Sequence, residues 1–351
     1  MLGDLLLEVA VTAVRPMQEG TDVPGTVLIR RGGSAANVAV AFAGLGGRAA
    51  FVGAIGRDGV GRQVAGALRD AGVAPHLVRV DAPTARLLAL VDRTGERSFV
   101  TERAAADRLR AADLRASWFR GAGALHLPGY SLYNQPLGEA AVEAVRLLRS
   151  GGSAASAGGA ASAGSGASAG SGPSLGSGPS KLGSGPSKGS ASGAGPILSI
   201  DLSSRAPMLA FGRQAAWQLI GELAPDVLFA NASEAAALAR SAGPEKLLEL
   251  ASCVVIKEGP AGCRVLWRGP GTGVEQIAVA TAPVAAADTT GAGDAFAAGF
   301  LSSLLGAGAG PGAATDPASR RWSAAVLRRA ALAGHRSAAD LLRSRRPELS
   351  L

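Results

Sequence analysis

Regular alternation between short apolar runs and helical segments constrains the fold of this chain most strongly. The apolar runs, rich in β-branched or aromatic residues, occupy residues 48–56, 123–129, 196–203, 225–231 and 253–259. Segments with helical periodicity occupy residues 58–72, 136–149 and 233–240. Strands that alternate with helices in this way form a parallel sheet covered by helices on both faces. The sequence therefore predicts an α/β fold with a mostly parallel central sheet.

A second pattern interrupts this alternation. Three short apolar runs follow one another without intervening helices, at residues 76–81, 85–92 and 97–103. The dipeptide Thr94-Gly95 lies in the turn between the last two, which favours antiparallel pairing. We expect these runs, with residues 9–31, to form a small β-strand lid on a single domain that covers residues 1–351.

Residues 150–195 consist almost entirely of Gly, Ser, Ala and Pro, with repeats close to "GSGPS". Such a segment cannot bury enough apolar area to offset the entropy lost on ordering, so we expect a flexible insertion. Lys181 and Lys188 lie among its glycines, but the spacing of a phosphate-binding P-loop is absent.

The net charge of +8 is concentrated at one end of the chain. Residues 320–351 hold eight arginines against Asp340 and Glu348, and Trp322 is the one aromatic residue among them. A platform of aromatic residues on which the bases of single-stranded nucleic acids stack is absent, so we expect a solvated Arg-rich helix and no nucleic-acid partner. The first residues lack a basic region and no apolar run reaches about 18 residues, so we expect a cytoplasmic protein without a membrane partner.

Polar residues follow several of the predicted strands. Asp201, Asn231 and Lys257 fall at or just beyond strand ends. Ligands of open α/β sheets bind beyond the carboxyl ends of the strands, so these positions predict a site.

Gly291, Ala292, Gly293 and Asp294 precede an apolar helical segment. Unpartnered N–H groups at a helix N-terminus attract anions, and small residues let an anion approach them. A carboxylate beside such an anion hole can take a proton from an attacking hydroxyl. The alternative is that Asp294 is an ordinary acid of a first helical turn.

A matching motif occurs near the start of the chain. "GGSAANVAVAFAGLG" (32–46) opens another helix with paired glycines, "NASE" begins at Asn231, and "KEGPAG" begins at Lys257. With "DTTGAGDAFAAGF" (288–300), these segments resemble the signatures of the ribokinase-like (PfkB) carbohydrate kinase family. The resemblance covers residues 3–305 apart from the insertion, and implies a ribokinase-like fold and an ATP-dependent sugar kinase.

The resemblance also implies roles for individual residues. Asp294 would be the general base, beside an anion hole of Gly291, Ala292 and Gly293. The sugar hydroxyls would be bound by Asp4, Gly32, Gly33 and Asn37, with a contribution from Glu8. ATP would be bound by Asn231, Glu234, Lys257, Gly259 and Gly262. Glu234 would hold Mg²⁺ through water, and Asp288 with Thr290 would bind a monovalent cation such as K⁺.

Three expectations stay open at this level. Arg103-Ala104-Ala105-Ala106 replaces the R-G-A-N pattern that is commoner in the family, which leaves the contact between lid and substrate undecided. No aromatic residue close to Asp4 or Asn37 offers an obvious base-stacking surface, with Phe42 and distant residues left open, which favours a polyol over a nucleoside. The alternatives are an adenosine-like nucleoside kinase and a catalytically silent sugar- or nucleotide-binding protein.

Relatives often dimerise through lid strands, so the resemblance also implies that a homodimer through these strands is an open expectation.

The segment before Asp4 carries a further expectation. Relatives have an apolar strand of several residues there, whereas Met1 and Leu2 precede Gly3 in this sequence. We expect either that a natural start lies upstream or that the shortened strand lowers stability and places Asp4 poorly.

Overall fold

The computed structural model describes residues 1–16, 19–91, 97–151, 195–269, 273–286, 288–306, 322–344 and 346–349. Nearly all of the predicted insertion, residues 152–194, lies outside the described residues. Within the described ranges, no helix combines the length and the apolar character that crossing a membrane requires.

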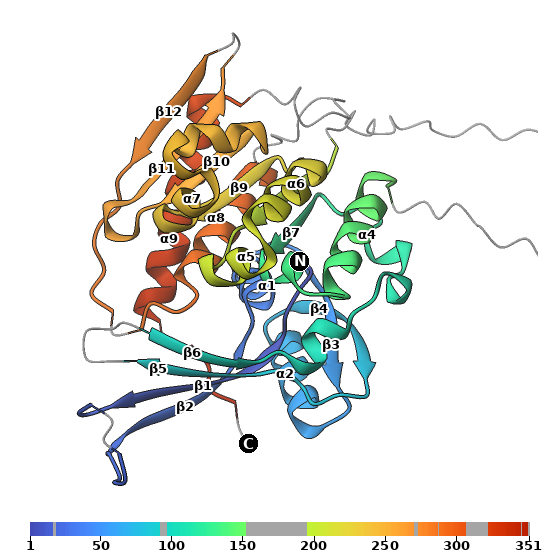
Figure 1. Cartoon of the computed structure of the whole chain (residues 1–351), viewed down its shortest axis with the longest axis vertical. Helices are drawn as coiled ribbons and strands as arrows, with labels where there is room; N and C mark the ends of the chain where they lie inside the picture. Colours follow the sequence, from blue (N-terminus) through green and yellow to red (C-terminus); the bar gives the residue numbers. More distant parts are fainter. Residues whose placement is uncertain are drawn as a thin grey trace, which may run out of the picture.

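A six-stranded sheet forms the centre of the molecule (Figure 1). Its strands, in spatial order, are β12 (Val274–Val279), β11 (Cys263–Arg268), β10 (Cys253–Lys257), β9 (Val227–Asn231), β8 (Ile197–Asp201) and β7 (Ala124–Pro128). The strands from β7 to β10 pair in parallel, and β11 and β12 add antiparallel strands at one edge. The four parallel strands lie where the apolar runs predicted them, within about two residues at each end.

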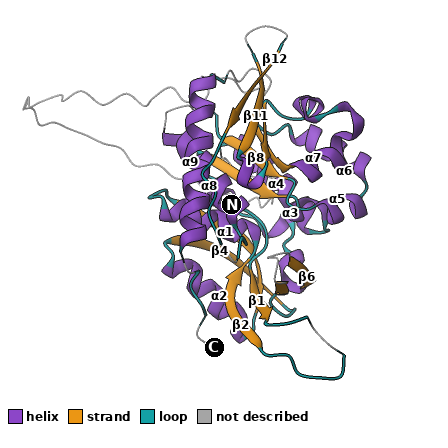
Figure 2. Cartoon of the chain, turned by 90° about the vertical axis from the view of Figure 1, so that its left-hand side faces the viewer, coloured by secondary structure: helices purple, strands orange, loops and turns teal. Residues whose placement is uncertain are grey.

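Alternating side chains divide the core between the two faces of this sheet. Leu228 and Ala230 pack on one face, whereas Val227 and Phe229 pack on the other. The first face is covered by α4 (Leu137–Arg149), α5 (Arg205–Phe211), α6 (Arg213–Leu223) and α7 (Ala232–Ala239). The second is covered by α1 (Ser34–Gly44), α8 (Ala292–Gly306) and α9 (Ala324–Arg343), whereas α2 (Gly59–Asp70) packs against β3 (Ala49–Gly56) and β4 (Val73–Val80). Figure 2 shows the two layers, with α8 and α9 opposite α5, α6 and α7. The predicted covering of both faces is confirmed.

Shorter helical segments connect these elements. The helix α3 (Tyr130–Tyr133) follows β7 directly. Turns of 3₁₀ helix occupy Ala104–Arg108, Ala111–Asp113, Ala116–Trp118, Arg240–Ala242, Pro244–Glu249 and Gly259–Ala261.

The first residues of the chain lie beside the central sheet. Leu2 is fully buried, forms a parallel bridge with Val52, and its N–H donates to the carbonyl oxygen of His126 at 3.2 Å. This segment therefore connects β7 to a two-stranded parallel sheet formed by β3 (Ala49–Gly56) and β4 (Val73–Val80). The prediction that residues 76–81 form an antiparallel lid strand was wrong. In the sequence, the helix α2 connects β3 to β4. This crossover brings the chain back to the starting edge of the sheet, so β4 runs in the same direction as β3 and the two strands pair in parallel.

A separate four-stranded sheet extends away from the helices (Figures 1 and 2). This projecting sheet contains β1 (Leu6–Ala13), β2 (Gly25–Gly32), β5 (Arg86–Val91) and β6 (Arg97–Glu102), in the order β2-β1-β5-β6. The pairs β1–β2 and β5–β6 are antiparallel, as expected of residues 85–103, and β1 pairs with β5 in parallel.

The C-terminal residues are arranged differently from the expectation of a solvated tail. The arginines at 328, 329, 336 and 343 on α9 are exposed, as predicted. Arg346, however, is only 11% exposed at its side chain and forms two hydrogen bonds with Glu8 of β1. The N–H of Leu349 donates to the carbonyl oxygen of Ile29 at 2.8 Å, so residues 346–349 lie along β2.

Candidate active site

Asp294 lies in the first turn of α8. This helix begins directly after Gly291, whose positive φ of 82° turns the chain into the helix. Two side chains from the start of α1 hold its carboxylate. The Ser34 hydroxyl donates to Oδ1 at 2.7 Å, and the Asn37 Nδ2 donates to Oδ2 at 2.8 Å. The two sequence motifs, about 260 residues apart in the chain, therefore meet at one carboxylate.

The electrostatic surroundings of Asp294 suit a proton acceptor. Burial raises its pKa to about 6, and Asp201 raises it as well, although the bonds from Ser34 and Asn37 and the charge of Lys257 lower it. A carboxylate with this pKa is mostly ionised at pH 7 and still holds a proton more readily than an exposed one. These are the properties of a general base that works near neutral pH.

One N–H group of the predicted anion hole already donates a hydrogen bond within the turn that precedes α8. The N–H of Ala292 donates to the carbonyl oxygen of Thr289 at 3.2 Å. The N–H groups of Gly293 and Asp294 belong to the first helical turn, where no carbonyl lies four residues back within the helix. Gly293 also has a steric role, because a Cβ there would lie 3.3 Å from the Lys257 Nζ.

A buried ion pair lies beside this helix terminus. The Lys257 Nζ at the end of β10 is 2.5 Å from Oδ2 of Asp201 at the end of β8. Burial alone would lower the pKa of Lys257, but Asp201 and Glu234 raise it above its ordinary value. Burial and the charge of Asp201 raise the pKa of Glu234, while Lys257 lowers it. One ammonium group thus compensates two carboxylates.

Asn231 and Glu234 form the capping box of α7. The Asn231 side chain accepts from the N–H of Glu234 at 2.9 Å, and the Glu234 carboxylate accepts from the N–H of Asn231 at 2.8 Å. These bonds fix the position of the buried Glu234 carboxylate at the start of the helix. The motif therefore has a structural role that is compatible with the expected position beside nucleotide phosphates.

The predicted residues converge on a cavity of about 520 Å³ between the projecting sheet and the carboxyl ends of the central strands. Asp4, Gly33, Asn37, Asn231, Glu234, Lys257, Gly259, Thr290, Gly291, Gly293 and Asp294 all line it, and Glu8 does so as well. Gly32 does not line it. We call it the acceptor cavity.

Asp4 has an unsatisfied oxygen in the acceptor cavity. Its Oδ2 lies 3.5 Å from Nη1 of Arg103, and its buried Oδ1 has no hydrogen-bond partner among the described residues. Nη2 of Arg103 is likewise buried without a partner in the described part of the chain. A polar ligand can satisfy both atoms. Gly33 has a φ of 105°, and a Cβ there would lie 2.2 Å from the Asp4 carbonyl oxygen, so only glycine fits this close approach.

The acceptor cavity also contains aromatic side chains. Phe99 of β6 and Tyr130 of α3 both line it, and the guanidinium of Arg103 lies 5.6 Å from the Tyr130 ring centroid. Phe99 and Tyr130 are thus among the distant aromatic residues that the sequence left open as a base-stacking surface. Sequence distance was a poor guide, because the fold brings β6 and α3 to the same cavity as β1 and α1.

A second cavity, of about 330 Å³, adjoins the first. Lys257, Gly259, Thr289 and Gly293 line both cavities, which places the start of α8 between them. The other walls are largely apolar and include Gly262, Ala292 and Phe296 as well as residues of α9. Gly262 has a φ of 103°, and a Cβ there would lie 2.2 Å from the carbonyl oxygen of Val279. We call this space the apolar cavity.

Asp288 pairs with an arginine. Its Oδ2 lies 2.7 Å from Nη1 of Arg30, and its Oδ1 accepts from the N–H of Thr290 at 2.8 Å. Asp288 does not line the acceptor cavity, whereas Thr290 does. The guanidinium of Arg30 therefore supplies a positive charge at the position where the resemblance implied K⁺.

Several site residues were missed at the sequence level. Ser34 lies inside a quoted motif but carried no role, and Asp201 was noted only as a residue at a strand end. Tyr130 and Ser203 had no signal of their own. Both follow strands of the central sheet, β7 and β8, so the rule about carboxyl strand ends could have identified them.

Comparison with known proteins supports a common family. The model of the pfkB family carbohydrate kinases matches residues 2–155 and 201–339. The probable fructokinase-4 of Arabidopsis thaliana is 37% identical over 139 residues, which is 38% of this chain and 42% of that protein. The chloroplastic probable fructokinase-6 of the same plant is 29% identical over 286 residues, 78% of this chain and 62% of that protein. The matches therefore span from about two fifths to three fifths of these relatives' lengths.

Solved structures share the fold. The adenosine kinase of Sinorhizobium meliloti superposes with a TM-score of 0.71 at 21% identity, covering 98% of this chain and 93% of that chain. The fructokinase of Vibrio cholerae O395, in its fructose-, ADP- and calcium-bound form, gives a TM-score of 0.66 at 22% identity, covering 98% and 92%. The predicted ribokinase-like fold is confirmed. With the family model matching most of its length, this chain belongs to the pfkB family of carbohydrate kinases.

Proposed function

We propose that the protein is an ATP-dependent kinase that transfers the γ-phosphate to a hydroxyl group of a sugar. The observation that carries the proposal is the half-buried Asp294 carboxylate, which lines the acceptor cavity at the start of α8 and has a pKa of about 6. The two plant relatives named above support the acceptor class, since both are described as probable fructokinases. Fructose is therefore the first acceptor to test.

The chemistry follows from the positions of the site residues. A sugar hydroxyl next to Asp294 gives its proton to the carboxylate as its oxygen attacks the γ-phosphorus of ATP. The bond between that phosphorus and the β–γ bridging oxygen breaks, and ADP leaves with this oxygen. Ser34 and Asn37 keep the carboxylate oriented throughout. Negative charge on the transferring group faces the N–H groups at the start of α8 and the Lys257 ammonium. Asp4 and Arg103 offer unsatisfied polar atoms that can fix other hydroxyls of the sugar.

Glu234 and Asp201 provide a donor set that fits Mg²⁺. Mg²⁺ is usually held by one or two carboxylates, several waters and substrate phosphates, and both side chains line the acceptor cavity. No cluster of three or more His, Cys, Asp or Glu side chains suited to a metal occurs among the described residues. When bound, Mg²⁺ would offset phosphate charge.

The apolar cavity, with Gly259 and Gly262 at its edge, would take the base of ATP.

A nucleoside kinase is the second candidate. Phe99 and Tyr130 line the acceptor cavity and provide aromatic faces for a base, which the sequence did not predict. Phe99 is 51% exposed, as expected of a side chain that a ligand could cover. A third candidate, a catalytically silent binding protein, is disfavoured by the complete arrangement of Asp294, Ser34 and Asn37.

An ADP-release screen tests the three candidates. The purified full chain is given ATP and Mg²⁺ with fructose, other hexoses, pentoses, keto-deoxy acids or nucleosides. We expect turnover with at least one sugar. Turnover with nucleosides alone would replace the sugar assignment, and ATP binding without transfer to any acceptor would favour the silent protein.

We further propose that the projecting sheet is a lid and that two copies associate through it. One face of this sheet carries Glu8, Leu87, Phe99 and Thr101, which line the acceptor cavity. The opposite face carries apolar side chains, namely Val9, Val11, Val27, Ile29, Leu88, Leu90 and Val100, and Val27 and Val100 are 59% and 66% exposed. An apolar face of this extent favours pairing with a second copy. Sedimentation equilibrium of the full chain and of Val100→Lys would test the dimer.

A further inference from the structure

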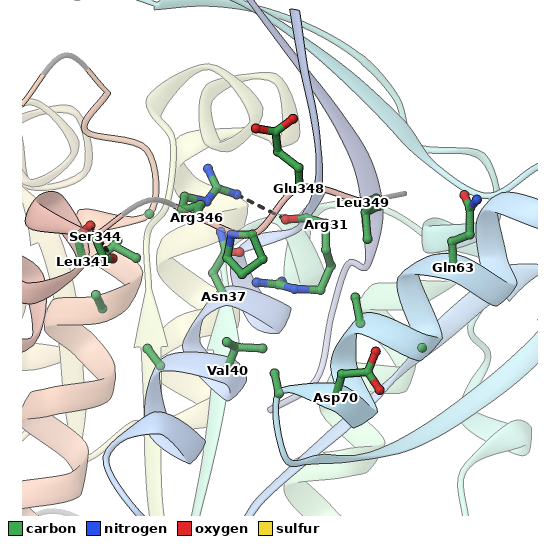
Figure 3. Close-up of a pocket in the computed structure, with 17 residues that line it drawn as sticks. Arg31, Asn37, Val40, Gln63, Asp70, Leu341, Ser344, Arg346, Glu348 and Leu349 are labelled. Carbon is green, nitrogen blue, oxygen red and sulfur yellow. Dashed lines mark hydrogen bonds between the residues drawn. The ribbon is translucent and has the colours of Figure 1, made fainter. Parts of the chain in front are cut away.

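A third cavity, of about 630 Å³, adjoins the acceptor cavity at Asn37 of α1 and at Gly291 (Figure 3). It is bounded by α1, α2, the end of α9 and the C-terminal residues 346–349. Val40 belongs to α1, Gln63 and Asp70 belong to α2, and Leu341 belongs to α9. Of the residues expected to contact the sugar, the phosphates or the nucleotide, only Asn37 and Gly291 line this space.

Arg31 supplies an unsatisfied positive group to this cavity. Its side chain lines the space, and in Figure 3 its guanidinium is directed toward Asn37. Nη1 of Arg31 is buried and has no hydrogen-bond partner among the described residues. Burial and the charge of Arg346 lower the pKa of Arg31 to about 10, so the group remains charged at pH 7. A buried guanidinium nitrogen without an acceptor is costly unless a ligand or water supplies one.

None of the nearby carboxylates forms a hydrogen bond with the Arg31 side chain among the described residues. Asp294, whose charge raises the pKa of Arg31, accepts from Ser34 and Asn37 instead. Glu8 forms hydrogen bonds of 3.0 and 2.8 Å with Nη1 and Nη2 of Arg346. Asp70 and Glu348 line the same cavity but are exposed, and no ion pair joins either of them to Arg31 in the described ranges. Two guanidinium groups therefore lie together with only one directly paired carboxylate between them.

We propose that this cavity binds a small anionic ligand, whose phosphate or carboxylate group accepts hydrogen bonds from Arg31. Guanidinium groups bind both of these planar or tetrahedral oxyanions through charge-assisted hydrogen bonds. The remaining lining combines apolar residues such as Val40 and Leu341 with polar Gln63 and Ser344, which suits a small metabolite rather than an inorganic ion alone.

The site lies directly behind the proposed general base. Asn37 and Gly291 line this cavity as well as the acceptor cavity, and Asn37 holds Asp294 by a 2.8 Å hydrogen bond. A ligand in the cavity therefore contacts the residues that position Asp294 without occupying the sugar or nucleotide sites. This inference goes beyond the proposed function, and it can be tested by binding alone, without turnover.

Calorimetric titration of the full chain tests the site. The protein is first saturated with a non-hydrolysable ATP analogue and Mg²⁺, so that the start of α8 is occupied. Inorganic phosphate and citrate are then titrated separately, and we expect at least one of them to bind. Binding of phosphate alone would assign a phosphate ligand, and binding of citrate alone would assign a carboxylate ligand. If neither anion binds, the proposal is wrong.

Three variants locate the binding. Arg31→Met should weaken it about tenfold or more, because a charge-assisted hydrogen bond is lost. Ala67→Phe, on the α2 wall, should abolish it by filling the cavity without changing the charge. Arg69→Met removes an exposed arginine from the same helix and should leave the affinity unchanged. Full affinity in Ala67→Phe, or in a folded Arg31→Met, would overturn the assignment, as would equal loss in Arg69→Met.

Discussion

At the scale of single residues, the proposed chemistry depends on how Asp294 is held. Its carboxylate is removed from water at the start of α8, which raises its pKa, and is kept usable as a base by hydrogen bonds from Ser34 and Asn37. Burial and hydrogen bonding act in opposite directions on the same group. The balance gives a base whose ionisation changes close to neutral pH.

Replacing Asp294 by Asn should lower kcat by roughly 10²–10⁴-fold, because the amide cannot accept the hydroxyl proton. Affinity for a non-hydrolysable ATP analogue should change far less. The matched control is Asp340→Asn on the exposed surface of α9, where kcat should be unchanged. Steady-state kinetics and analogue titration measure both quantities. Nearly full turnover in Asp294→Asn would exclude the general-base role.

The pH profile should report the same carboxylate. A general base must be ionised, so kcat/KM for the acceptor should rise with pH through about 6 and level off above about 7. Ser34→Ala removes a hydrogen bond that stabilises the ionised form, so the acid limb should move to higher pH. A limb that stays in place or moves to lower pH in this variant would contradict the assignment.

At the scale of secondary-structure elements, two ion pairs connect segments around the site. Lys257 on β10 reaches Asp201 on β8 across the intervening strand β9. Arg30 on β2 reaches Asp288 in the loop that leads to α8. The first pair joins two residues that line the acceptor cavity, and the second holds the loop whose Thr289 and Thr290 line it.

Lys257→Met should destabilise the protein by about 3–5 kcal/mol, because it leaves Asp201 and Glu234 buried without their countercharge. Lys246→Met is the control, since the exposed Lys246–Glu249 pair should contribute less than about 1 kcal/mol. Urea unfolding of both variants gives the two free energies. Equal stability of the two variants would mean that the buried pair does not stabilise the fold.

The Arg30–Asp288 pair predicts the response to monovalent cations. Because a guanidinium already lies against Asp288, exchanging K⁺ for Na⁺ at constant ionic strength should change kcat by less than about twofold. The assay uses the acceptor identified in the ADP-release screen. Strong activation by K⁺ alone would show that the loop at 288–290 still binds a cation.

At the scale of the whole molecule, the insertion separates two parts of one sheet. The helix α4 ends at Arg149 and β8 begins at Ile197, and β7 and β8 pair directly in parallel. The family model matches residues 2–155 and 201–339, so the segment between these ranges lies outside the match. The described site residues come from either side of this segment.

Replacing residues 152–194 with a short Gly/Ser turn should preserve both the fold and the activity. Loop length contributes weakly to stability, at about 0.6 kcal/mol for each doubling. Melting temperature and turnover of the shortened chain measure the outcome, with Asp294→Asn in the same background as the inactive control. A folded but inactive deletion would show that the segment contributes to the site.

The sequence alone determined the fold class and most members of the site. Apolar runs in β10 and the other parallel strands are buried on both faces, and this burial leaves a pattern that can be read locally. Gly33 and Gly291 adopt positive φ angles that favour glycine, so the motifs that contain them can be recognised from the sequence. The polar residues at the ends of β8, β9 and β10 could be predicted because the strand pattern shows where each strand ends.

Only the tertiary structure decided how these residues act on one another. Ser34 and Asn37 reach Asp294 across about 260 residues of chain, and β4 pairs with β3 rather than with the projecting sheet. Arg346, expected in a solvated tail, pairs with Glu8. Contacts between distant segments depend on the packing of the whole chain and leave no local pattern. The same holds for Arg31, whose unsatisfied guanidinium becomes visible only once the helices enclose the cavity around it.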